Sequence, residues 1–411
     1  MRVGIFTDSY PPYINGVSTS VVMLKKALEK KGHQVYIVTV NDSFHGYKFE
    51  DNNRTIRVPG IPVGIYDYRM TRIYPVKIIN KIKKWNLDII HSQTEFGIGI
   101  FARIIAKQFN IPLVHTYHTL YEDYVHYITK GYFNKSSKKV VQYLTKFYCD
   151  KTATELIVPT KKIYSLFKEK YKYERNIHIV PTGIEIERFF KEKIKQDDVN
   201  KICKELEIKK DDFIILFIGR LGKEKNIEFL IESQSLIVKK YPFCKLIIIG
   251  DGPDADSYLK LVNKLKLSNN VKLIGKKTFD DIPKYYQIAD VFATASKSET
   301  QGLTVIEAMS ASVPVVAIED DSFKEIIVPD LNGYLFKNKK QYYKNIESLI
   351  ENKEKKEFLS MQARNTSESY SSKYFAEKIL KVYESALKGR NTNKTFIGRF
   401  KNVIKKGWHG K

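Results

Sequence analysis

The chain has 411 residues, and its 70 lysines and arginines outnumber its 46 aspartates and glutamates, which gives a formal net charge of +24. This length argues against a single hydrophobic core, and 43% apolar with 28% charged residues is ordinary for a globular protein, so we expect two domains of nearly equal size. The positive charge favours an anionic partner, and the candidates are nucleic acid, an acidic membrane surface and a phosphorylated substrate.

The cysteine spacing and the length of the apolar runs indicate in which cellular compartment the protein is expected. Cys149, Cys203 and Cys244 lack the spacing of a metal knuckle or a disulfide framework, which fits a reducing environment. The first residues, MRVGIFTDSY, lack the apolar core of a signal peptide, and nowhere do about 18 apolar residues follow one another. We expect a cytoplasmic protein that contacts a membrane only peripherally.

The first half of the chain alternates short apolar runs with longer amphipathic stretches. The predicted strands cover residues 2–8, 34–40, 87–93, 112–118, 155–160 and 176–182. They are apolar on both faces, as parallel strands covered by helices must be. Helices are predicted between them, for example over 18–31 and 97–109. This alternation predicts a Rossmann-like α/β domain over 1–190.

The second half repeats this pattern. The predicted strands cover 213–220, 244–252, 271–275, 291–296 and 314–318. The polar, charge-rich segment 183–211 is predicted to be a linker, and a second Rossmann-like domain is predicted over 205–370. Residues 340–388 have the pattern of consecutive helices, of which 371–388 is expected to cross back to the first domain, and 389–411 is predicted to be a basic amphipathic tail. Two such domains facing each other leave a cleft, and ligands gather at the carboxyl ends of the strands.

The first strand–helix turn, DSYPPYINGVSTS, lacks the G-x-G-x-x-G pattern, which disfavours a dehydrogenase. Gly16 stands just before a helix, where a bare backbone lets a phosphate approach closely. The alternative is a simple turn glycine.

The segment GRLGKEKN follows a predicted strand and places Arg220 and Lys225 at its carboxyl end. A planar guanidinium and an ammonium are the usual pair for phosphate oxygens, so we expect a diphosphate site. Ordinary loop cations of a basic chain are the alternative.

The segment PLVHTYHT places two histidines at the end of another predicted strand. Their spacing points them to opposite faces, so at most one faces the cleft. His118 is the candidate for contacting a substrate, while His115 suits a core histidine satisfied by the backbone.

The segment SETQGLTVIE places Glu299 in a polar loop, turns at Gly302 and enters an apolar helix near Leu303. The helix directs its free amides and positive dipole end towards an anion. Glu307, one turn into the helix, is expected near the same pocket, where a carboxylate accepts hydrogen bonds from a diol such as ribose. A capping acid on an amphipathic helix is the alternative, but it gives no reason for an acid within LTVIEAM.

Together these motifs resemble those of the retaining glycosyltransferases of GT-B architecture that carry two glutamates separated by seven residues. The resemblance covers about 1–385 and includes EAM and PVVA after the second glutamate, GRL with its following lysine, and PTGIE and RF within 181–189. It implies two Rossmann-like domains facing across a cleft. Ser312 stands where that family usually has a glycine, so we expect a local adjustment there.

The resemblance also implies how the donor is bound. The implied donor-binding residues are Gly16, Arg220, Lys225, Gly302, Leu303, Thr304 and Glu307. Arg220 and Lys225 hold the nucleotide diphosphate in such enzymes, and Glu307 binds the ribose. The implied catalytic residues, His118 and Glu299, contact the transferred sugar. No metal is implied, because the cations and the helix dipole neutralise the leaving diphosphate. The product keeps the α-configuration, and no nucleophile can be assigned.

Basic, aromatic-rich stretches indicate the acceptor. Residues 69–84 hold six basic residues and no acid, 130–175 hold twelve against four acids, and the tail is basic as well. The interleaved aromatic residues are Tyr132, Phe133, Tyr143, Phe147, Tyr148, Phe396, Phe400 and Trp408. This composition favours an anionic membrane surface. A solvated lysine-rich surface is the alternative, and nucleic acid is disfavoured because no binding module is evident.

FTDSYPPYINGVSTSV, HSQTEFGIGIFARIIAK, HTYHTLYEDYVHYI and SKSETQGLTVIEAM are together most similar to diacylglycerol glucosyltransferases of low-GC Gram-positive bacteria and mollicutes. This resemblance implies glucose transfer from UDP-glucose, or a related sugar nucleotide, to diacylglycerol at the inner face of the cell membrane. A transferase acting on another glycolipid, a wall polymer or a capsule unit is the rival expectation. A basic membrane scaffold with a decayed site is disfavoured, because both cations and both glutamates are present.

Overall fold

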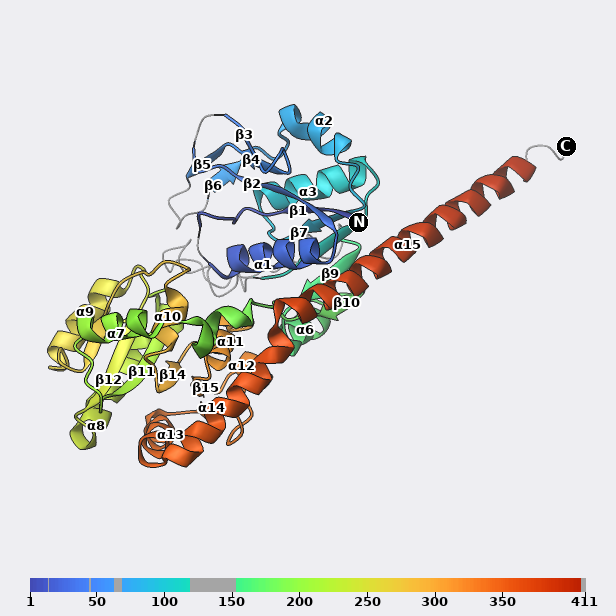
Figure 1. Cartoon of the computed structure of the whole chain (residues 1–411). Coiled ribbons are helices and arrows are strands. Elements are labelled where there is room, and N and C mark those ends of the chain that lie inside the picture. The colour runs from blue at the N-terminus through green and yellow to red at the C-terminus, as the bar shows by residue number, and fades with distance from the viewer. Residues whose placement is uncertain (14, 44–45, 63–68, 119–152, 408–411) are drawn as a thin grey trace, which may run out of the picture. The chain divides into compact units, whose positions relative to one another are not determined.

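The structure is a computed structural model that describes residues 1–13, 15–43, 46–62, 69–118 and 153–407, with 390–407 described by their backbone alone. The chain divides into two compact units (Figure 1). Unit 1 comprises Met1–Pro159, Ile163–Gly183 and Lys373–Lys411, and unit 2 comprises Thr160–Lys162 and Ile184–Ser372. A three-residue piece of the first half of the chain therefore belongs to unit 2.

Unit 1 is built on an eight-stranded sheet with the order β10-β9-β8-β7-β1-β2-β4-β3. Its neighbouring strands are parallel except for the antiparallel pair of β3 and β4. The strands are β1 (Arg2–Phe6), β2 (Gln34–Val40), β3 (Lys48–Glu50), β4 (Thr55–Val58), β7 (Ile89–Ser92), β8 (Leu113–Thr116), β9 (Glu155–Val158) and β10 (Ile177–Ile179). Six of these strands lie within the predicted runs, and the pair β3 and β4 adds an edge that the apolar pattern did not predict.

Helices cover both faces of this sheet. Along β2, Ile37 belongs to one buried core and Val38 to another, because successive side chains of a strand point to opposite faces. Helix α1 (Gly16–Lys30) and the first part of α15 (Ser372–Gly407) pack in the first core. Helices α2 (Val76–Lys84) and α3 (Gly97–Gln108) pack in the second. Unit 1 is therefore a three-layer α/β structure.

Unit 2 contains a six-stranded, fully parallel sheet with the order β13-β12-β11-β14-β15-β16. This is the doubly wound Rossmann order, with its switch point between β11 and β14. The strands are β11 (Phe213–Ile218), β12 (Cys244–Ile249), β13 (Val271–Leu273), β14 (Val291–Thr294), β15 (Val315–Ile318) and β16 (Gly333–Phe336). The helices are α7 (Gln196–Glu205), α8 (Ile227–Lys240), α9 (Ala255–Lys264), α10 (Ile282–Tyr286), α11 (Leu303–Ser310), α12 (Asp321–Lys324), α13 (Lys339–Glu351) and α14 (Lys353–Ser367). The two parallel α/β sheets confirm the predicted fold class.

The segment 183–211 is not the linker that its polarity predicted. It forms short 3-10 turns and helix α7, and it buries Ile186, Phe189, Val199 and Ile202 in the core of unit 2. The few apolar residues at helical spacing were enough to fold it. Helix α15 likewise continues through the position where the sequence predicted a separate tail.

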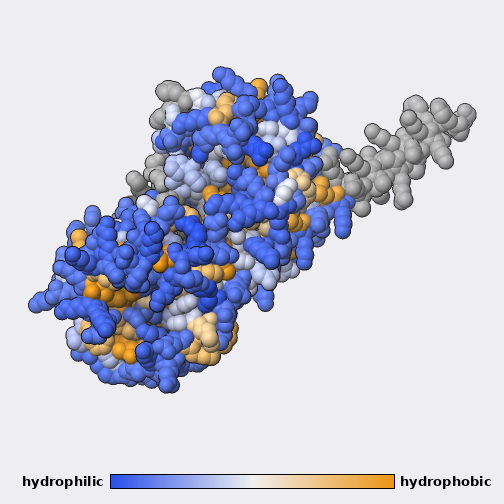
Figure 2. Space-filling view, viewed as in Figure 1, coloured by the Kyte–Doolittle hydropathy of each residue, from blue (hydrophilic) through white to orange (hydrophobic). Residues whose placement is uncertain are grey.

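One face of the molecule is mostly polar. In Figure 2 the face in view is predominantly hydrophilic, and apolar side chains show in small groups among charged ones. Within the described residues, no helix is both long and apolar enough to cross a membrane. The aromatic residues predicted to be important at 132–148 and in the tail, together with Cys149, have side chains outside the described residues.

Candidate active site

The loops that follow β11 and β14 carry Arg220, Lys225, Glu299 and Gly302, and these strands flank the switch point of the unit 2 sheet. Arg220 leaves the end of β11 and pairs with the carboxylate of Glu224, whose side chain is only 5% exposed. The loop passes close to Gly250, where a Cβ atom would lie 1.8 Å from the carbonyl oxygen of Gly219 and the backbone φ is +143°. Only glycine fits there, and its close approach places the Arg220 loop beside the end of β12.

Lys225 and Glu299 form an ion pair that joins these two loops. The Lys225 ammonium donates to the Glu299 carboxylate, and both side chains are about one-fifth exposed, at 18% and 19%. Burial alone would raise the pKa of Glu299, but the charge and the hydrogen bond of Lys225, together with Ser296 and the charge of Lys162, hold the pKa below its ordinary value. Glu299 is therefore an ionised hydrogen-bond acceptor rather than an acid.

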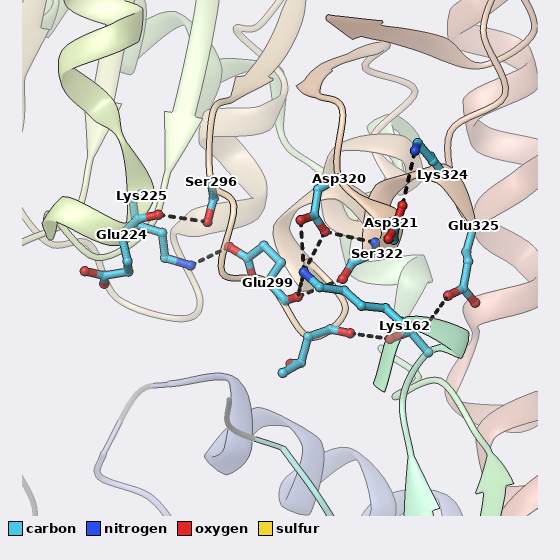
Figure 3. Close-up of polar contacts among 12 residues, drawn as sticks. Lys162, Glu224, Lys225, Ser296, Glu299, Asp320, Asp321, Ser322, Lys324 and Glu325 are labelled. Carbon is cyan, nitrogen blue, oxygen red and sulfur yellow. Dashed lines mark hydrogen bonds and ion pairs between the residues drawn. The ribbon is translucent and has the colours of Figure 1, made fainter. Parts of the chain in front are cut away.

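The backbone of the Glu299 loop is held by side chains from elsewhere in unit 2 (Figure 3). Lys162 Nζ donates to the carbonyl oxygen of Glu299 at 3.2 Å, and Ser322 Oγ donates to the same oxygen at 2.7 Å. The next carbonyl, that of Thr300, accepts a hydrogen bond from Thr160 Oγ1 at 2.9 Å. Two consecutive peptide groups of the loop are thus fixed.

Gly302 makes the turn into α11 in the left-handed conformation, with φ of +81°. A Cβ atom on this residue would lie 2.7 Å from Cε1 of Phe323. Gly302 is the N-cap residue and has no side chain to accept from the first amides of α11, those at Leu303 and Thr304. These amides and the positive end of the helix dipole are suited to an anion.

Glu307 lies one turn into α11 and is half-buried. Its Oε2 accepts a hydrogen bond from the Tyr286 hydroxyl at 2.9 Å, and the same hydroxyl is 3.1 Å from the carbonyl oxygen of Thr304. Burial raises the pKa of Glu307 to about 7, although the Tyr286 hydrogen bond and the charge of Arg188 both act to lower it. Among the described residues, this carboxylate has no ion pair like the one that Glu299 makes with Lys225.

In unit 1, His118 follows β8 and its Nε2 lies 2.6 Å from Oε1 of Gln93, the residue after β7. Burial lowers the pKa of His118 to about 4, so the imidazole is neutral near pH 7. His115 is fully buried, with Nε2 3.0 Å from Glu95 and Nδ1 3.1 Å from the carbonyl oxygen of Ser92. This agrees with its interpretation as a satisfied core histidine.

Gly16 is the first residue of α1. Its neighbour Asn15 is the N-cap and accepts from the amide of Ser18 at 2.9 Å. An asparagine N-cap satisfies one of the free amides at the helix start and fixes where the helix begins. Gly16 is exposed, and α1 begins at this residue and not at residue 18, where the sequence predicted the helix to start.

Within unit 2, Lys225 contacts Glu299, and Arg220 lies in the same loop after β11 as Lys225. His118 and Gly16 belong to unit 1. The sequence did not predict Lys162, Ser322, Glu224 or Tyr286, which contact the predicted residues. Glu224 lies in GRLGKEKN, the same charged segment that predicted Arg220 and Lys225. No local sequence pattern indicates Lys162, Ser322 or Tyr286. Among the described residues, no group of three or more His, Cys, Asp or Glu side chains could hold a metal ion.

Comparisons with known proteins identify the family of the chain. Residues 198–366 match the family model described as glycosyl transferases group 1, and residues 14–188 match Glycosyltransferase Family 4. An alpha-monoglucosyldiacylglycerol synthase of Acholeplasma laidlawii is 35% identical over 388 residues, which are 93% of this chain and 96% of that protein. A protein of the same name from Streptococcus pneumoniae is 35% identical over 82% of this chain and 75% of its own length.

A similar solved structure is that of the Anabaena protein HepE in complex with UDP-glucose, with a TM-score of 0.70 and 17% identity over 94% of this chain and 100% of that chain. This likeness shows the fold. With relatives of 35% identity over most of their length, and with both halves matched by glycosyltransferase models, the chain belongs to the group 1 glycosyltransferases of GT-B fold.

Proposed function

We propose that this glycosyltransferase moves a glucosyl group from UDP-glucose to the free hydroxyl of diacylglycerol and forms an α-glucosyl-diacylglycerol. The observation that carries the proposal is the 35% identity to an alpha-monoglucosyldiacylglycerol synthase over 96% of that protein. The proposal is also supported by the arrangement of cations, carboxylates and a helix N-terminus around one switch point in unit 2.

In the proposed complex, Arg220 and Lys225 bind the diphosphate of the donor together with the amides that begin α11. A guanidinium fork, an ammonium and unpaired amides supply complementary hydrogen bonds to phosphate oxygens. Glu307 accepts from the ribose hydroxyls, and Tyr286 orients its carboxylate. The protein HepE, whose structure was solved with UDP-glucose, has the same fold and lends support to this choice of donor.

During transfer, the bond between the sugar C1 and the diphosphate oxygen breaks, a bond from C1 to the acceptor oxygen forms on the same face, and the proton of the acceptor hydroxyl passes to the departing diphosphate. Positive groups around the diphosphate stabilise the negative charge that the leaving UDP develops. Glu299 is ionised and paired with Lys225, so its proposed role is to accept hydrogen bonds from sugar hydroxyls. His118, neutral and held through Gln93, is proposed to contact the sugar near C1.

The proposed acceptor side is a surface of unit 1 that combines exposed apolar and basic side chains. Ile61 and Met70 are opposite each other in the two-stranded ladder of β5 (Gly60–Pro62) and β6 (Arg69–Thr71), and they are 63% and 66% exposed. Val76, at the start of α2, is 68% exposed, and Lys83 and Lys84 at its end are exposed as well. Apolar groups that insert and lysines that contribute about 1 kcal/mol each near anionic lipid suit a peripheral position on the inner face of the cell membrane.

The test of the activity is incubation of the purified protein with vesicles of anionic lipid containing diacylglycerol and with UDP-glucose, UDP-galactose or other sugar nucleotides. We expect a hexosyl-diacylglycerol from UDP-glucose, with an α-anomeric proton coupling in its NMR spectrum. A product only with another glycolipid or a polymer acceptor would establish the rival acceptor class. The absence of any product from every donor on diacylglycerol contradicts the lipid proposal.

Vesicle flotation tests the membrane surface separately. Ile61→Ser with Met70→Ser should reduce flotation with anionic vesicles. The matched control is Leu259→Ser with Met361→Ser, which removes two exposed apolar side chains of unit 2, 50% and 54% exposed. Equal flotation of both double variants contradicts this placement of the membrane surface.

A further inference from the structure

We propose that Lys162 is a positioning residue for sugar transfer, which holds the peptide group of Glu299 so that its carboxylate meets the donor sugar. The inference rests on the proposed function and extends it to a residue that contacts neither nucleotide nor sugar in that proposal. Lys162 lies in α6 (Lys161–Ser165), 137 residues before Glu299 in the chain.

All three donors of the Lys162 ammonium are accounted for. Nζ lies 2.9 Å from each carboxylate oxygen of Asp320 and 3.2 Å from the carbonyl oxygen of Glu299. The side chains of Lys162 and Asp320 are 20% and 12% exposed, so water screens this pair only partly. A lysine on the surface would not hold one geometry in this way, because its flexible stem costs entropy to fix.

Asp320 is itself fixed by the helix that it begins. It is the N-cap of α12 and accepts from the amide of Ser322 at 2.9 Å, while Ser322 Oγ donates to the same Glu299 carbonyl that Lys162 contacts. Lys162, Asp320, Ser322 and the Glu299 carbonyl therefore form a closed set of hydrogen bonds, which we call the loop clamp. Each member orients the next.

Glu299 is consequently held at two places (Figure 3). Lys225 holds its carboxylate, and the loop clamp holds its peptide carbonyl. The side-chain pair with Lys225 alone leaves the peptide free to shift. A displacement of about 1 Å in a catalytic group can cost about a hundredfold in rate, so the clamp sets how well Glu299 meets the sugar.

The position of Lys162 in the chain gives the clamp a second property. Thr160–Lys162 belongs to unit 2, whereas Pro159 before it and Ile163 after it belong to unit 1. The chain thus contributes Lys162, together with Thr160 on the next carbonyl, at a point where it passes from one unit into the other and back. The loop that carries Glu299 is fixed by this crossing segment and not only by its own neighbours in sequence.

The experiment compares Lys162→Met and Lys162→Arg with the unchanged full-length protein. Calorimetry gives the dissociation constants for UDP and UDP-glucose, and the vesicle assay gives kcat and KM. For Lys162→Met we expect an affinity for UDP within about twofold of that of the unchanged protein. UDP-glucose should no longer bind more tightly than UDP, and kcat should be reduced by about tenfold or more. Lys162→Arg retains the charge and the donors and should recover part of kcat.

The matched control is Lys324→Met. Lys324 pairs with Asp321 and Glu319, each at 3.1 Å, and lies on the same short helix α12 without a hydrogen bond to the Glu299 loop among the described contacts. We expect this variant to keep both affinities and kcat. It separates the clamp from the loss of one lysine charge.

Ser322→Ala supplies a second test should Lys162→Met fail to fold, because it removes a donor to the same carbonyl and leaves the buried charges paired. It should show the same division, with UDP affinity kept and kcat lowered. Unchanged kcat and UDP-glucose affinity in the clamp variants overturn the proposal, and so does an equal loss of UDP affinity and kcat. If the unchanged protein binds no UDP-glucose and transfers nothing, the proposed function fails instead, and the two failures are thereby distinguished.

Discussion

Tyr286 donates a hydrogen bond to Glu307, with 2.9 Å between its hydroxyl oxygen and Oε2 of the carboxylate. The tyrosine is fully buried and closes the short helix α10, so it presents its hydroxyl to the carboxylate in one orientation. The carboxylate is nevertheless costly to ionise, because burial raises its pKa to about 7. The proposed ribose-binding group is therefore close to half-protonated at neutral pH.

This pKa predicts a pH dependence of donor binding. Ribose hydroxyls donate to the ionised carboxylate, so the ionised form binds the donor more tightly. Below the pKa of about 7 a proton must leave before the donor binds, and affinity should fall by up to about tenfold for each pH unit as the pH falls. Above that value affinity should be constant. His118 adds nothing in this range, because burial holds its pKa at about 4.

Calorimetric titration with UDP-glucose measures the effect. UDP-glucose is preferable to UDP because the terminal phosphate of UDP titrates at about pH 6, which would add its own pH dependence to the measured affinity. Glu307→Gln serves as the control and should bind weakly with no slope near pH 7. A flat profile in the unchanged protein, or the same slope in Glu307→Gln, contradicts the assignment.

Tyr286→Phe should weaken UDP-glucose binding at neutral pH by about threefold, because the lost hydrogen bond, worth about 1 kcal/mol, favours the ionised carboxylate that binds the donor. Since that bond lowers the pKa of Glu307, its loss should also move the midpoint of the pH profile upward. Tyr285→Phe is the matched control, because this adjacent buried ring lies 5.7 Å from Lys277 Nζ and, among the described residues, makes no hydrogen bond to Glu307. An unmoved midpoint in Tyr286→Phe would show that the hydroxyl does not tune the carboxylate.

The sequence was informative where chemistry and fold are encoded locally. Apolar runs identified eleven strands of the two sheets, because parallel strands buried on both faces need continuous apolar sequence. Arg220, Lys225, Glu299 and Glu307 were recognisable because each lies at a strand end or helix start beside a glycine or an apolar run. The sequence could thus predict which segments carry the candidate site residues.

The contacts that complete the site were not predictable in this way. Lys162 contacts a loop 137 residues later in the chain, and Tyr286 contacts a carboxylate 21 residues later. Helix and strand periodicity relates only residues that are a few positions apart, so it cannot predict these contacts. The edge strand β3 is exposed along its length and therefore has no apolar pattern. Such features follow from tertiary packing, which a single sequence leaves open.

Ser312→Gly should stabilise unit 2. Ser312 has a φ of +60° and follows Ala311, the C-cap of α11. Its amide donates to the carbonyl oxygen of Met309 and the amide of Val313 donates to that of Ala308, which is the pattern of a Schellman C-cap. The left-handed conformation destabilises the folded state by about 1–2 kcal/mol for a serine. Glycine avoids this cost but loses more conformational entropy on folding, which offsets about 0.5–1 kcal/mol of the gain. Ser312 therefore carries a conformational cost at a position where the family resemblance implies a glycine.

We expect the Ser312→Gly substitution to raise the thermal transition of unit 2 by about 1–4 °C in calorimetry. Ser312→Ala is the control, because alanine lacks the hydroxyl but keeps the penalty of a positive φ. It should show no gain. A similar rise in both variants would mean that the serine hydroxyl, and not the backbone conformation, is the source of the cost.

Glu299→Gln should separate sugar transfer from nucleotide binding. Glutamine has the shape of glutamate and leaves the loop clamp intact, but it removes the negative charge that Lys225 neutralises. Affinity for UDP should stay within about threefold or improve, because one negative charge fewer lies near the diphosphate. By contrast, kcat should fall by about a hundredfold, which is the usual effect of losing one group that stabilises the transition state. Glu319→Gln changes the net charge equally in a carboxylate that pairs with Lys324 and Lys337, and it should leave both quantities unchanged. If Glu299→Gln instead loses UDP affinity in proportion to kcat, then Glu299 acts by holding Lys225 for the diphosphate, and its assignment to the sugar is wrong.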